Sequence, residues 1–145
     1  ELLVSAPDSE SDYASQVQLV EDMIARGVDG IIICAINTDA IVTAVKKANE
    51  AADYAQLDAI KTAVVFAYTD AHVKDAEFKD IKSITVKEAE SATTGLTVTV
   101  DPAEDAGKTL DISPYYDLSK NTFKSDATEA KWTPADGWKL TYPTK

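Results

Sequence analysis

The side chains that most often carry catalysis are scarce in this sequence and do not form a recognisable motif. His72 is the only histidine, Cys34 is the only cysteine, and no motif pairs a nucleophile with a general base. We expect His72 near a helix C-terminus, where the helix dipole favours a cation, and Cys34 as a small buried hydrophobe. The sequence therefore predicts a protein that is not an enzyme, with no catalytic residue and no cofactor.

Carboxylates are abundant, with 25 Asp and Glu residues. A glycosidase holds two carboxylates across a cleft, but sequence spacing alone does not place such a pair, and we favour a solvated acidic surface. Asp101, Glu104 and Asp105 cluster in one turn and offer the oxygen ligands that Ca²⁺ prefers, but the alternating ligands and distant Glu of an EF-hand loop are missing. We predict a polar hairpin connection over residues 101–107 and no metal site.

The overall charge excludes two classes of partner. Lys and Arg number 14, so the net charge is −11, and the chain repels phosphate backbones and anionic lipid surfaces. The longest apolar run, Val28–Ile36, is far shorter than the roughly 20 residues of a membrane span. We expect no nucleic-acid binding and no membrane span in an ordinary soluble fold.

The first third of the sequence predicts two strands joined by a helix. Leu2–Ser5 is a short apolar run, and apolar residues recur at helical spacing over Asp12–Arg26 before Gly27 supplies a C-terminal stop. Val28–Ile36 is β-branched and continuously apolar, which is typical of a strand buried on both faces. We expect a parallel strand pair with a right-handed crossover, a βαβ fragment.

A long helix is predicted next. Asn37 and Thr38 are good N-cap residues, and Asp39 places a negative charge in the first turn. There is no Gly or Pro from Asp39 to Ala71, so we expect one continuous helix from about Thr38 to about Ala71.

Beyond Ala71 the apolar period changes to two, which predicts an antiparallel sheet. The fold class is therefore α+β: an N-terminal βαβ fragment running into a long helix, followed by an antiparallel β-sheet. The alternating positions are Ile84 and Val86; Leu96, Val98 and Val100; Leu110 and Ile112; and Trp138, Leu140 and Tyr142.

Residues 2–51 resemble the N-terminal lobe of ribose-type periplasmic sugar-binding proteins. The resemblance rests on QLVEDMIARGVDGIII at residues 18–33, NTDAI at 37–41 and AVKKANEA at 44–51. It implies a sugar-binding module of an ABC-type importer in the periplasm. In that family a glycine and an apolar strand follow, whereas this chain has Ala52-Asp53-Tyr54-Ala55.

Residues 50–145 resemble, more weakly, the soluble head of a type IV pilin. This similarity rests on the Ala-rich helix Ala51–Tyr68, the strands after it, and a C-terminal strand with Trp and Pro residues. It implies a structural subunit of an extracellular filament, with a role in cell adhesion. We therefore divide the chain into a binding-protein fragment at 1–51 and a pilin-like segment at 52–145, joined by a natural or engineered fusion.

Asn37 and Asp39 are the candidate ligand-binding residues. Both follow a predicted buried strand, and ligands of parallel sheets bind beyond the strand C-termini. Helix capping explains the same residues without a ligand, and we favour it. A carbohydrate-stacking face and packing in the core or against another subunit are both open to four aromatic residues, and we favour packing. They are Tyr115, Tyr116, Trp132 and Trp138.

The main functional hypothesis is a non-enzymatic, pilin-like structural protein; the alternative is a truncated sugar-binding module. We expect an extracellular or cell-envelope location, and a sugar as the ligand of the alternative. Since Ile31–Ala35 has only Leu2–Ser5 as a predicted neighbour, we also expect self-association in which equivalent segments of two copies pair.

Overall fold

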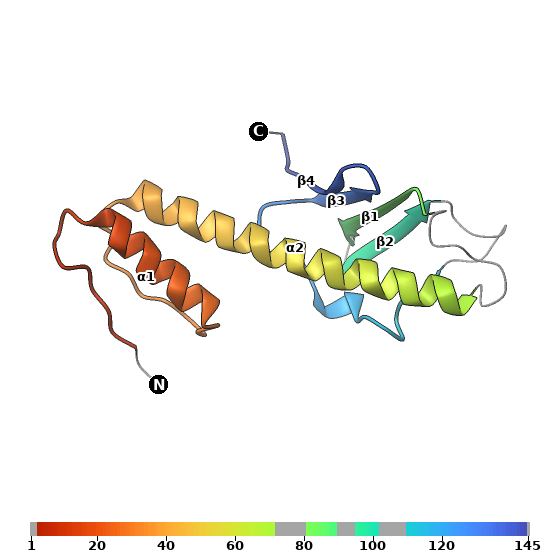
Figure 1. The fold of residues 1–145 in the computed structure, drawn as a ribbon, viewed down its shortest axis with the longest axis horizontal. Coiled ribbons are helices and arrows are strands. Elements are labelled where there is room, and N and C mark those ends of the chain that lie inside the picture. Colours follow the sequence, from red (N-terminus) through yellow and green to blue (C-terminus); the bar gives the residue numbers. More distant parts are fainter. Residues whose placement is uncertain (1–2, 72–80, 90–94, 102–109, 145) are drawn as a thin grey trace. The chain divides into compact units, whose positions relative to one another are not determined.

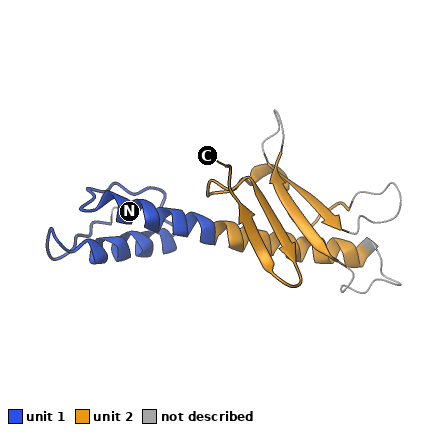
Figure 2. Ribbon diagram, turned by 90° about the horizontal axis from the view of Figure 1, so that it is seen from above, with its two compact units in different colours: residues 1–51 blue, residues 52–145 orange. Residues whose placement is uncertain are grey.

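The computed structural model describes residues 3–71, 81–89, 95–101 and 110–144 (Figure 1). The chain divides into two compact units, residues 1–51 and 52–145, with the boundary inside helix α2 (Figure 2). A helix-rich N-terminal part precedes a four-stranded antiparallel sheet, which confirms the α+β class. The assignment of residues 1–51 to a binding-protein fragment and of residues 52–145 to a pilin-like segment stays a prediction. In chain order the described elements are α1 (Tyr13–Ala25), α2 (Thr38–Ala71), β1 (Ser83–Glu88), β2 (Leu96–Asp101), the 3₁₀ helix η2 (Leu118–Lys120), β3 (Glu129–Thr133) and β4 (Gly137–Thr141).

Both predicted helices form, with ends set by local signals. The Asp12 carboxylate accepts a hydrogen bond from the Ser15 N–H at 3.0 Å and caps α1. Gly27, just beyond the end of α1, has φ of +68°, the left-handed conformation that glycine adopts after a helix. The continuous helix expected from Thr38 to Ala71 is confirmed, and Asp39 lies in its first turn.

The parallel strand pair predicted for the first third is not formed in the described residues. Neither residues 3–5 of the first run nor Val28–Ile36 is a strand. A strand exists only with a hydrogen-bonded neighbour, and neither run finds one. Instead, the side-chain amide of Gln16 on α1 bonds to the backbone of the second run, donating to Cys34 O and accepting from Ile36 N, each at 2.8 Å.

The sheet has the strand order β2-β1-β3-β4, and all its described pairings are antiparallel. The strands predicted around Ile84, Leu96 and Leu140 are confirmed, although Tyr142 lies just beyond β4. Strand β3 was not predicted, and it pairs with β1 and β4 in the middle of the order. The predicted strand at 110–112 is wrong: Ile112 lies outside any strand but is buried at 4% exposure in the core. Residues 102–107 of the predicted hairpin connection lie outside the described part.

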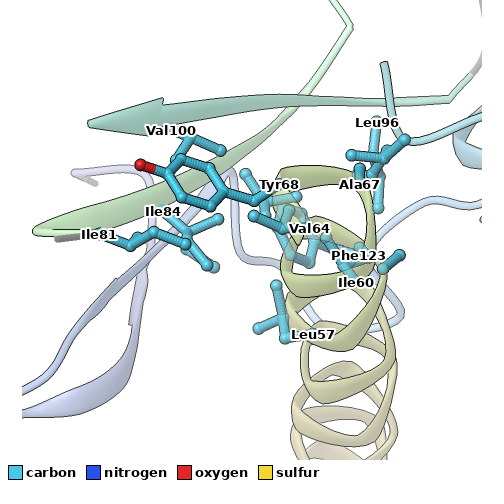
Figure 3. Close-up of a cluster of buried hydrophobic side chains, with 14 of the residues drawn as sticks. Leu57, Ile60, Val64, Ala67, Tyr68, Ile81, Ile84, Leu96, Val100 and Phe123 are labelled. Carbon is cyan, nitrogen blue, oxygen red and sulfur yellow. The ribbon is translucent and has the colours of Figure 1, made fainter. Parts of the chain in front are cut away.

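The core of the second unit lies between α2 and one face of this sheet. Leu57, Ile60 and Val64 of α2 are fully buried and belong to the same apolar cluster as Ile84 of β1 (Figure 3). Their spacing of three and four residues places them on one helix face. Apolar side chains of the sheet alternate, so that Ile84 and Val86 are both fully buried.

Two contacts hold the loops of this unit. The Asp53 carboxylate on α2 is fully buried and accepts hydrogen bonds from Lys124 N at 2.6 Å and Ser125 N at 2.9 Å. Gly95, with φ of +132°, lies against η2: a Cβ there would be 2.8 Å from both Leu118 O and Ser119 Cα. Only glycine fits both that conformation and that approach.

Candidate functional site

Asn37 and Asp39 lie at the start of α2 and line the same surface hollow. The hollow has a volume of about 490 Å³ and lies between α1 and the first turns of α2 within the first unit. From α1 it is lined by Tyr13, Val17 and Glu21, whose spacing of four residues places them on one helix face. The remaining lining residues are Ala14, Ala40, Thr43, Ala44 and Lys47.

The two candidate residues differ in whether their side-chain oxygens are already used in hydrogen bonds within the chain. The Asn37 side-chain oxygen accepts a hydrogen bond from Ala40 N at 3.0 Å, so it caps α2 as expected. Asp39 is exposed, and within the described residues its carboxylate has no hydrogen-bond or ion-pair partner. Its backbone oxygen accepts from the Thr43 hydroxyl at 2.8 Å. Capping therefore accounts for Asn37, and ligand binding by the pair stays a prediction.

A second hollow of the first unit, about 460 Å³, is more apolar. Its walls come from Leu19, Val20 and Met23 of α1, from the run after Gly30, and from residues 5–10. Cys34 is among the lining residues and is exposed, so the expectation of a buried cysteine is wrong. The physical reason is that the run containing Cys34 is not covered by the sheet that was predicted to bury it.

Gln16 was not singled out from the sequence, yet it organises this region. It is only 8% exposed, and both ends of its amide bond to the backbone. A signal existed: Gln16 lies four residues before Val20 and seven before Met23, on the apolar face of α1. A polar residue at such a position must find partners when it is buried.

The four aromatic residues weighed as a stacking face do not act as one surface. Trp132 and Trp138 are opposite each other on β3 and β4 and pack against the core, as does Tyr116. Trp138 Nε1 donates to the Asp58 carboxylate at 3.1 Å, and Lys61 Nζ lies 4.3 Å from the Trp132 ring centroid. Packing against the core is thus confirmed for these three. Tyr115, by contrast, is 40% exposed, and its ring centroid lies 5.9 Å from the ring centroid of Phe66.

The shifted acids of the second unit belong to turns. Hydrogen bonds from the Ser119 side chain and from Lys120 lower the pKa of Asp117 to about 2. Lys139, 2.9 Å away, lowers the pKa of Asp136 in the turn between β3 and β4. Burial raises the pKa of the Tyr116 phenol. The interactions of Asp117 and Asp136 stabilise the turns in which they lie.

Some sequence-based expectations fall on residues outside the described part. His72, Glu104 and Asp105 are among them. Within the described ranges, no group of three or more His, Cys, Asp or Glu side chains is arranged to hold a metal ion. No helix in the described part of the chain combines the length and apolarity of a membrane-crossing segment.

Comparison with known proteins shows what the segment that contains the first hollow is similar to. Residues 1–69 match the periplasmic binding protein domain. A D-ribose/D-allose-binding protein of Pseudomonas aeruginosa is 41% identical over 51 residues, which are 35% of this chain and 16% of that protein. No solved structure matches the chain. The resemblance of the N-terminal part to periplasmic sugar-binding proteins is confirmed, and nothing in these comparisons supports the pilin-like assignment of the remainder.

Proposed function

We propose that this chain is a non-enzymatic solute-binding protein of the periplasmic type, with a small sugar as its ligand. The observation that carries the proposal is the 41% identity to a protein named for binding D-ribose and D-allose. The chain spans about a sixth of that relative, so the ligand is carried over as a hypothesis. A cell-envelope location, in the periplasm, accompanies this function.

The hollow at the start of α2 supports the proposal through its chemistry. Sugars present many hydroxyl groups, which both donate and accept hydrogen bonds. Asp39 offers a carboxylate acceptor, Lys47 an ammonium donor, and Thr43 a hydroxyl. Tyr13, 53% exposed, adds an aromatic face of the kind that packs against the C–H face of a sugar ring. The volume of about 490 Å³ is in the range of small-ligand pockets.

Isothermal titration calorimetry of the full chain with D-ribose, D-allose and other pentoses and hexoses tests this function. We expect saturable binding of at least one sugar with a Kd below about 1 mM. Asp39→Asn should abolish most of the heat, because it removes the charged acceptor and keeps the size of the side chain. Lys46→Ala is the matched control, because Lys46 is exposed on the same helix but does not line the hollow.

Two results would overturn the proposal. One is the absence of saturable heat with every sugar of the panel. The other is a sugar isotherm that Asp39→Asn and Lys46→Ala leave equally unchanged, because the hollow would then not be the site.

A filament subunit of the pilin type is a second candidate, with an extracellular location and a natural or engineered fusion as its origin. The observation that favours it is the packing of the second half of α2 on an antiparallel sheet. Electron microscopy of the concentrated protein tests it. Regular filaments are expected, and dispersed particles at every concentration would contradict it.

A further inference from the structure

We draw no further inference here: the strongest candidate, the apolar hollow between α1 and the run after Gly30 in the first unit, carries none because nothing in the described structure shows what covers it.

Discussion

Removal of the Asp53 carboxylate should be among the most damaging single substitutions in the second unit. Asp53 is 0% exposed on α2, and its two oxygens accept hydrogen bonds from Lys124 N and Ser125 N. Each bond to a charged group contributes about 1.5 to 3 kcal/mol. In Asp53→Ala both amides lose their acceptor, but they lie near the surface, where water replaces part of the loss. We therefore expect the free energy of unfolding to fall by about 2 to 4 kcal/mol.

Urea unfolding followed by tryptophan fluorescence measures this loss. Both tryptophans, Trp132 and Trp138, lie on β3 and β4, so the signal reports the second unit. Asp53→Asn keeps one oxygen acceptor and should lose roughly half as much stability as Asp53→Ala. Asp70→Ala removes the same group from an exposed position of the same helix and should change the free energy by less than about 0.5 kcal/mol.

The reasoning would be refuted if Asp53→Ala and Asp70→Ala had the same midpoint and slope as the unchanged protein. It would also be refuted if Asp53→Asn were more destabilising than Asp53→Ala, because the remaining acceptor would then contribute nothing.

Three further predictions concern other parts of the chain. Gly95→Ala should lower the midpoint of thermal unfolding and cost at least about 2 kcal/mol, because a Cβ there meets backbone atoms at 2.8 Å and φ is +132°; an unchanged midpoint would contradict the close approach. Gln16→Ala should speed hydrogen exchange of the Ile36 amide about tenfold, since its acceptor is lost; unchanged exchange would argue against that bond. NMR titration of Asp117 should give a pKa of about 2, and Ser119→Ala should raise it towards 3.8. Because that pKa is depressed in the fold, the stabilisation is present above about pH 4 and is lost as pH falls towards 2; a midpoint near 3.8 in the unchanged protein would contradict it.

The helices were predictable because their signals are local. The capping side chains Asp12 and Asn37 each bond to an N–H three residues later, and Gly27 takes the left-handed conformation beyond α1. The absence of Gly and Pro let α2 continue to Ala71. None of these features depends on a distant part of the chain.

Strands were harder to predict from the sequence than helices, because a strand forms only when it hydrogen-bonds to a neighbouring strand. Val28–Ile36 has the composition of a buried strand, but in the described structure it has no strand to pair with, and Cys34 is exposed as a result. Strand β3 shows the opposite case. Its buried residue on the inner face is Ala130, a weak apolar signal that hid the alternation, and pairing with β1 and β4 makes it a strand.

The candidate site also combines features that contiguous residues determine with contacts between residues distant in sequence. The sequence alone determined that Asn37 and Asp39 lie at a helix start and that the surrounding segment resembles sugar-binding proteins, because both properties are contained in contiguous residues. Only the tertiary structure placed Asn37 and Asp39 in a common hollow with Tyr13, and brought Gln16 to the backbone of Cys34 and Ile36. The tertiary structure also placed Asp53 against a loop about seventy residues away. Such contacts join residues distant in sequence, and their formation depends on how whole elements pack, which no local pattern encodes.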